Sequence, residues 1–183
     1  MLYVIRHGIT DWNLKKKLQG QTDIPLNEEG RRMAKEAAAA LRDIHFDLCY
    51  SSPLIRAKET AEILLRGRDI PILTDDRLKE MAFGICEGAE DYRHLEGTSI
   101  PVLFRTPEKY TDPPEGAESL DDLFARTGEF LTECIYPELN AGKDILIVGH
   151  GAMNSAIISN IRHLPRNEFW STGIPNCKLI RLL

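Results

Sequence analysis

The chain has 183 residues, of which 43% are hydrophobic and 28% are charged, an ordinary balance for a globular protein. This length suits a single domain with a sizeable hydrophobic core. The formal net charge of -5 at pH 7 excludes a general electrostatic attraction to nucleic acids or anionic membranes, so a phosphate site would have to concentrate its cations locally.

No apolar run in the sequence is long enough to span a bilayer, and no signal peptide is visible at the N-terminus. The four cysteines are widely spaced and form no CxxC pair, which argues against a zinc cluster and for reduced thiols. We therefore expect a cytoplasmic protein that binds neither membranes nor nucleic acids.

The first predicted strand, residues 3–5, runs directly into Arg6, His7 and Gly8. The apolar run is too short for a helix and ends at a turn signal, so it is typical of a buried strand. Ligands of open α/β sheets bind at the carboxyl ends of the strands. A cation, an imidazole and a glycine at that edge indicate an anion site with a nucleophile, although a structural histidine would give the same triplet. Residues 8–26 are predicted to form a long, functional loop.

Asn27 is predicted to cap an amphipathic helix that continues to about residue 42 and carries two glutamates in its first turn. A short strand is expected at residues 46–50. It is followed by Ser52 as an N-cap and Pro53 at the first position of a helix that ends near residue 66. Arg56 then lies in the first helical turn, where unpaired N–H groups also favour an anion.

The middle of the chain is predicted to form a third strand at residues 70–73 and a turn at residues 78–84 that carries Glu80. From about residue 86 to residue 116 the sequence is rich in loop signals. We interpret this segment as a variable insertion that forms the wall or lid of a site.

The last part of the chain repeats the opening pattern. Ser119 is predicted to cap a long helix. Asp144 is then followed by an all-apolar run at residues 145–148, typical of a buried strand, that leads to Gly149, His150 and Gly151. A helix follows, and residues 177–183 are predicted to form a closing strand. With no linker and no second core, we expect one α/β domain over residues 1–183.

Three predicted strands therefore end in a turn that bears a cation or an imidazole: Arg6 and His7, Ser52 leading to Arg56, and His150. Intervening helices favour parallel neighbouring strands, which would bring these groups to one edge of the sheet. Two guanidinium groups and two imidazoles suit a dianionic phosphoryl group. Either histidine could act as the nucleophile on these grounds alone.

Four stretches in a fixed order extend this pattern over nearly the whole chain. They are residues 6–8 with Thr10, Trp12 and Asn13, residues 25–30, residues 51–57 with Thr60 and Ala61, and residues 148–151. With these motifs the chain resembles the histidine phosphatase superfamily, in the branch of cofactor-dependent phosphoglycerate mutases and broad-specificity phosphatases. The resemblance implies a three-layer α/β/α sandwich with a mostly parallel central sheet.

The resemblance also implies roles for individual residues. It implies a phosphohistidine intermediate at His7, catalytic contacts from Arg6, Arg56 and His150, and a general acid/base at Glu80. Apart from the resemblance, the sequence contains no carboxylate–histidine cluster with metal-ligand spacing, so we expect neither a metal nor a cofactor. The substrate-binding positions that match are Thr10, Asn13, Gln19, Gly20 and Gly151.

Departures from the mutases favour hydrolysis. Mutases carry a basic and aromatic string after the acid, whereas Met81, Ala82 and Phe83 follow Glu80 here. We expect a metal-independent phosphomonoesterase with a small phosphorylated substrate. The alternatives are a phosphoglycerate mutase and a non-catalytic phosphate-binding member.

Some assignments stay open. Without the resemblance, Glu80 would be read as a surface acid that pairs with Lys79 or Arg77. The natural phosphoester is not specified, and the oligomeric state is open, with a homodimer as one option. Four basic residues of the insertion could grip an anion, but surface exposure is the expectation for each: Arg93, His94, Arg105 and Lys109.

Overall fold

Five strands form one sheet in the order β3-β2-β4-β1-β5. The computed structural model describes all residues from Met1 to Leu183. Strands β1 to β4 are parallel, and β5 pairs with β1 in the antiparallel direction. The expected mostly parallel sheet is therefore confirmed. The strands are β1 (Leu2–Arg6), β2 (Leu48–Ser51), β3 (Ile72–Thr74), β4 (Ile145–Gly149) and β5 (Leu179–Arg181).

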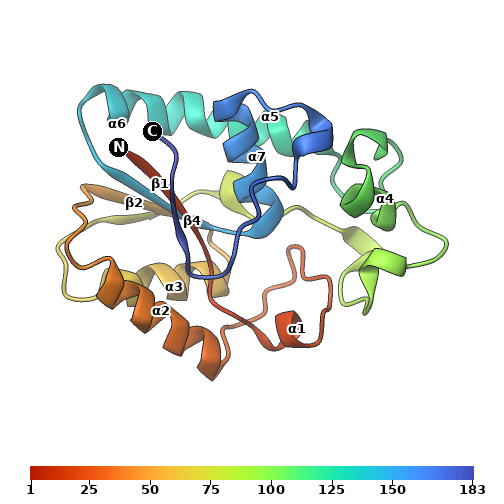
Figure 1. The fold of residues 1–183 in the computed structure, drawn as a ribbon, viewed down its shortest axis with the longest axis horizontal. Coiled ribbons are helices and arrows are strands. Elements are labelled where there is room, and N and C mark those ends of the chain that lie inside the picture. Colours follow the sequence, from red (N-terminus) through yellow and green to blue (C-terminus); the bar gives the residue numbers. More distant parts are fainter.

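Helices cover both faces of the sheet, which confirms the three-layer α/β/α arrangement. In Figure 1, α2 and α3 lie on one side of the strands, and α5, α6 and α7 lie on the other. Helix α4 stands apart at one end of the molecule. None of the helices is both long and apolar enough to cross a membrane. The helices are α1 (Asp11–Leu14), α2 (Glu28–Ala40), α3 (Ile55–Leu64), α4 (Ile100–Arg105), α5 (Leu120–Phe130), α6 (Tyr136–Asn140) and α7 (Gly151–Arg162).

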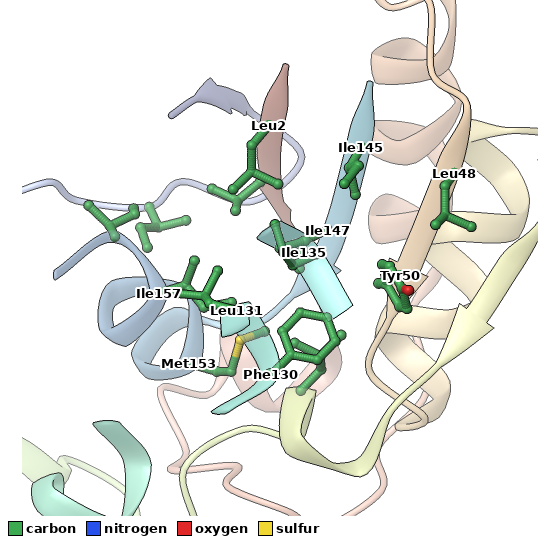
Figure 2. Close-up of a cluster of buried hydrophobic side chains, with 14 residues drawn as sticks. Leu2, Leu48, Tyr50, Phe130, Leu131, Ile135, Ile145, Ile147, Met153 and Ile157 are labelled. Atoms are coloured by element: carbon green, nitrogen blue, oxygen red, sulfur yellow. The ribbon is translucent and has the colours of Figure 1, made fainter. Parts of the chain in front are cut away.

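The two faces of β4 supply two hydrophobic cores. Ile145 and Ile147 pack toward α5 and α7 together with Phe130 and Met153, as Figure 2 shows. Leu146 and Val148 belong to the core under α2 and α3. Because side chains alternate along a strand, an all-apolar β4 requires helices on both sides. This burial holds β4 rigidly in the middle of the sheet, directly before His150.

Three helix starts were predicted from capping residues: those at Asn27 and Ser119 are confirmed, and that at Ser52 is not. The Asn27 side chain accepts the N–H of Gly30, so the expected N-cap of α2 is confirmed. The start of α3 was predicted wrongly, because its N-cap is Leu54 rather than Ser52. Ser52 Oγ accepts the N–H of Leu54 instead, and Asp23 accepts the first helical N–H, that of Ile55. A distant loop residue has replaced the local cap.

The loop and the insertion are more structured than predicted. The loop of residues 8–26 contains α1, which begins with a capping box between Thr10 and Asn13. The insertion contains α4, where Ile100 and Leu103 are fully buried in a third hydrophobic cluster. Most of the other members of this cluster lie outside the insertion, so the local turn signals of the insertion did not indicate it. The predicted helix after Ser119 ends as α5, and a π-helical turn at Leu131–Ile135 joins it to α6.

Candidate active site

The carboxyl ends of β1 and β4 bring His7 and His150 together. The parallel register pairs Arg6 with Gly149, and the N–H of His7 donates to the Gly149 carbonyl at 2.9 Å. The next side chains along each strand therefore become neighbours. The centroids of the two imidazole rings are 5.1 Å apart, with the planes tilted by 59°. The expected convergence of the two histidines is observed.

His7 is buried and held in one orientation. Its Nδ1 lies 2.6 Å from the carbonyl oxygen of Gly8. Since a carbonyl can only accept, Nδ1 carries the proton and Nε2 keeps a lone pair. Burial lowers the pKa of His7 well below 6.5, and the positive charges of Arg56 and Arg6 lower it further. The ring is therefore neutral at physiological pH.

His150 is fully buried, and neither of its ring nitrogens has a hydrogen-bond partner in the protein. Burial again lowers the pKa well below 6.5, followed by the charges of Arg56, His7 and Arg6. Buried polar atoms are normally paired. Two unpaired ring nitrogens beside the other histidine therefore mark a position suited to a polar ligand.

Arg56 is a fully buried cation. It donates through Nη1 to the Thr22 carbonyl at 2.9 Å and through Nη2 to the Gly20 carbonyl at 2.6 Å. Burial lowers its pKa to about 10, against the opposing charge of Glu80, so it stays charged at pH 7. Arg56 thereby fixes the loop that carries Gly20 and leaves its Nε unpartnered.

The C-terminal segment before β5 holds the end of β1. Asn176 Nδ2 donates to the His7 carbonyl at 2.7 Å, and the N–H of Cys177 donates to the Arg6 carbonyl at 2.9 Å. Arg6 Nη1 in turn donates to the Ile174 carbonyl at 3.2 Å. No local pattern indicated these contacts, because they depend on the antiparallel return of the chain beside β1.

Glu80 lies at the N-terminus of α7. Its Oε2 accepts N–H groups from Gly151 at 2.9 Å and Ala152 at 3.3 Å, and its Oε1 accepts the N–H of Met153 at 3.0 Å. The N–H of Met81 adds a fourth donor at 2.9 Å. The helix dipole also favours a carboxylate at this place.

The alternative of a surface acid is wrong for Glu80. Its residue is only 9% exposed, and the neighbouring cations have other partners. Lys79 pairs with Asp76, and Arg77 pairs with Asp75 and with Glu133 on α5's C-terminal extension.

These groups border one cavity of about 350 Å³. Thr10 and His150 do not line it: both are fully buried, and Thr10 supports the wall by donating to Gln19 Oε1 at 2.9 Å. The other eight predicted site residues line the cavity: Arg6, His7, Asn13, Gln19, Gly20, Arg56, Glu80 and Gly151.

Glu87 was missed at the sequence level. Its Oε1 accepts the N–H groups of Gln21 and Phe83, both at 3.0 Å. Its Oε2 accepts the N–H of Thr22 at 2.9 Å and the Thr22 hydroxyl at 2.5 Å. One carboxylate therefore joins the loop next to Gly20 to the segment that follows Glu80. No local pattern distinguishes this acid from the other acids of the insertion.

The basic residues of the insertion are exposed as expected. His94 pairs with Asp91, and Arg105 donates to the Arg93 carbonyl at 2.6 Å. Arg93 differs from the others because it also lines the cavity, as does Lys17. Both cations lie on the side of the cavity formed by loops rather than by strand ends.

The comparison with protein families places the chain. The family model described as histidine phosphatase superfamily (branch 1) matches residues 2–183. The chain belongs to the histidine phosphatase superfamily. The resemblance inferred from the motifs is thus confirmed.

Proteins named as mutases and proteins named as phosphatases both occur among the relatives of this chain. A 2,3-bisphosphoglycerate-dependent phosphoglycerate mutase of Cytophaga hutchinsonii is 34% identical, over 96% of this chain and 85% of its own length. A protein of Bacillus subtilis named as an uncharacterized phosphatase, PhoE, is 38% identical, over 86% of this chain and 75% of its own length.

A solved structure gives the same fold. The mycobacterial glucosyl-3-phosphoglycerate phosphatase in complex with VO3 superposes with a TM-score of 0.85 and 30% identity. The match covers 97% of this chain and 90% of that chain. The histidine phosphatase fold therefore accounts for the whole chain.

Proposed function

We propose that this histidine phosphatase family member is a metal-independent phosphomonoesterase that hydrolyses a small phosphorylated metabolite. The observation that carries the proposal is the state of His7. Its ring is neutral and oriented by Gly8, its Nε2 keeps a lone pair, and two guanidinium groups adjoin it. Neutral imidazole is a competent nucleophile, and the cations stabilise the phosphoryl group that it attacks.

In the proposed first step, His7 Nε2 attacks phosphorus and the bond from phosphorus to the ester oxygen breaks. Arg6 and Arg56, which line the cavity, bind the phosphoryl oxygens, with the Gly151 N–H and Asn13 as further donors. His150 lies beside His7 behind the lining, and its unpartnered ring nitrogens supply the remaining contact. The bound phosphoryl group takes over the Gly151 N–H from Glu80, and the carboxylate then takes up a proton from solvent and gives it to the departing alkoxide. The products of this step are the free alcohol and a phosphohistidine.

In the second step, water attacks the phosphohistidine while the Glu80 carboxylate removes a proton. Inorganic phosphate leaves, and His7 regains its lone pair. Because phosphoryl transfer depends mainly on positioning and charge stabilisation, the protein needs little beyond these groups.

Hydrolysis is favoured over mutase activity by the surroundings of Glu80. Met81 and Phe83, which follow the acid, are buried in a hydrophobic cluster rather than offering charge to a substrate carboxylate. The neighbouring glucosyl-3-phosphoglycerate phosphatase also points to hydrolysis. A phosphoglycerate mutase remains the second candidate, because the relative from Cytophaga hutchinsonii carries that name.

The test measures phosphate release from p-nitrophenyl phosphate in the presence of a chelator. Wild type and the surface variant His45→Ala are expected to be active, and His7→Ala to lose activity. Equal release by His7→Ala would reject the proposal. A parallel assay with 3-phosphoglycerate, primed by 2,3-bisphosphoglycerate, separates the reactions. Fast interconversion of phosphoglycerates with little free phosphate would assign the chain to the mutases, and tight binding of phosphoesters without turnover would indicate a non-catalytic member.

A further inference from the structure

The cavity has two chemically different ends. At the strand ends it is lined by Arg6, His7 and Arg56, which suit the phosphoryl group. Another part of the lining, the aromatic wall, comes from the turn after Glu80, the insertion and the segment after α7, and it consists of four aromatic residues: Phe83, Tyr92, Phe104 and Trp170. The alcohol part of a bound phosphoester must point toward this wall.

The aromatic wall is one connected cluster around Phe104. The Phe104 ring stacks on Trp170, with centroids 5.2 Å apart and planes within 15°. Tyr92 lies 4.7 Å from Phe104, and Phe83 lies 6.3 Å from it. Trp170 is fixed further by its Nε1, which donates to the Leu103 carbonyl at 2.8 Å. The cluster is therefore held in place before any ligand binds, which lowers the entropic cost of binding.

The cations near this wall are few. Lys17 pairs with Glu90 at 3.4 Å. Arg93 is exposed, and its guanidinium lies 5.9 Å from the centroid of the Phe104 ring. A second anionic group on the substrate could pair only with Arg93, because Lys17 is already paired. An uncharged ring could instead pack against the aromatic side chains, next to the guanidinium that lies over Phe104.

We propose that the aromatic wall is a binding site for an uncharged ring on the alcohol part of the substrate, so that this enzyme prefers phosphate monoesters of aromatic or ring-bearing alcohols. The inference rests on the proposed phosphatase function. It assigns Phe104, Tyr92 and Trp170 to substrate selection rather than to the chemical step.

The test compares phenethyl phosphate with ethyl phosphate. Both release a primary alkoxide, so their chemical reactivity is similar and the ratio of their kcat/KM values reports the ring alone. In wild type we expect the ratio to favour phenethyl phosphate by about 10-fold or more. In Phe104→Ala the ratio should fall to within about 3-fold of unity, through loss of kcat/KM for phenethyl phosphate.

Tyr136→Ala is the matched control for Tyr92→Ala. Tyr136 lies on α6, is 38% exposed and does not line the cavity. Only the Tyr92 variant should lower the ratio. If Phe104→Ala fails to fold, Phe104→Leu keeps apolar volume and should give an intermediate ratio.

The outcomes separate this inference from the proposed function. A wild-type ratio near unity, with activity that still depends on His7, would overturn the aromatic site and leave the phosphatase intact. A strong preference for 3-phosphoglycerate that disappears in Arg93→Ala would show that an anion occupies this wall, and would also overturn it. If wild type hydrolyses neither ester nor p-nitrophenyl phosphate, the proposed function itself fails.

Discussion

The Oε2 atom of Glu80 and the backbone nitrogen of Gly151 lie 2.9 Å apart. The proposed proton donor is therefore seated on the same helix N-terminus that we propose for the phosphoryl group. Helix N-termini bind anions through unpaired N–H groups. The carboxylate and the phosphoryl group consequently compete for the Gly151 N–H, which links substrate binding to the position of the acid.

Replacement of Glu80 by Gln is expected to affect substrates according to their leaving groups. The amide cannot give a proton to an alkoxide, so kcat for ethyl phosphate should fall about 100-fold to 10,000-fold. The loss for p-nitrophenyl phosphate should be much smaller, because nitrophenolate departs without protonation. Glu133→Gln, at an exposed acid, is the control. Equal losses for both esters would contradict the role of Glu80 as an acid.

Gly151→Ala should separate ligand binding from folding. A Cβ atom at this position would meet Arg6 Cζ at 3.5 Å and Glu80 Oε2 at 3.6 Å, which are ordinary contacts, so the melting temperature should change little. The methyl group would nevertheless occupy space beside the N–H proposed for the phosphoryl group. We expect at least about a 10-fold rise in the inhibition constant of inorganic phosphate.

Two other glycine variants serve as controls for the melting temperature and the phosphate inhibition of Gly151→Ala. Gly128→Ala lies in α5 with its nearest neighbour at 3.6 Å, and it should leave both properties unchanged. Gly8→Ala would place Cβ 2.5 Å from the backbone oxygen of Gly30 and should lower the melting temperature. Unchanged phosphate inhibition in Gly151→Ala would remove this N–H from the proposed site.

Glu87→Gln tests whether Glu87 is a positioning residue. The amide keeps one acceptor oxygen and puts an NH2 donor against groups that donate, so contacts to Gln21 and Phe83 or to Thr22 are lost. Stability should fall by about 2 kcal/mol, measured by urea unfolding. The discriminating readout is the ratio of kcat for p-nitrophenyl phosphate to kcat for ethyl phosphate, which should rise as Glu80 loses its alignment. Glu90→Gln is the control, and a loss of stability with an unchanged ratio would indicate a purely structural role.

Acid should destabilise the fold through the two buried histidines. The pKa values of His7 and His150 are lowered well below 6.5 in the folded protein, so the unfolded chain binds more protons below about pH 6.5. The free energy of unfolding therefore falls as the pH drops from about 6.5 toward the folded-state values, by at most about 1.4 kcal/mol per pH unit for each histidine. Urea unfolding between about pH 7 and pH 5 should show a shallower acid dependence in the His7→Asn, His150→Asn double variant. Identical slopes would contradict buried, neutral histidines.

The strands, and the sheet edge at which their carboxyl ends lie side by side, were predictable from local patterns. Residues 145–148 are apolar without interruption, which is typical of a strand covered on both sides. His150 and Arg56 follow strands for which the intervening helices favoured a parallel arrangement, as observed. Asn27 and Ser119 cap helices where the sequence placed them. Each of these features depends on neighbours within a few positions.

Features that depend on distant partners were not predictable. Asp23 accepts the first N–H of α3 and so displaced the cap expected at Ser52. Glu87 finds its donors on a loop 65 residues away along the chain. Asn176 acquires its contact with His7 only through strand pairing. In each case a common polar residue makes its contacts only after the chain has folded, so neither composition nor spacing could indicate them.

The order in which β1 and its partner strands are synthesised determines when β1 can join the sheet. This strand is made first, yet its partners are β4 and β5, and the Arg6 and His7 carbonyls are bonded by Cys177 and Asn176. Domains usually fold as they leave the ribosome, beginning from the N-terminal side. Here β1 lacks both of its partner strands until the chain has been made as far as β5. A polypeptide released before that point would leave the apolar edges of β1 unpaired and would lack the contacts that hold His7 in place.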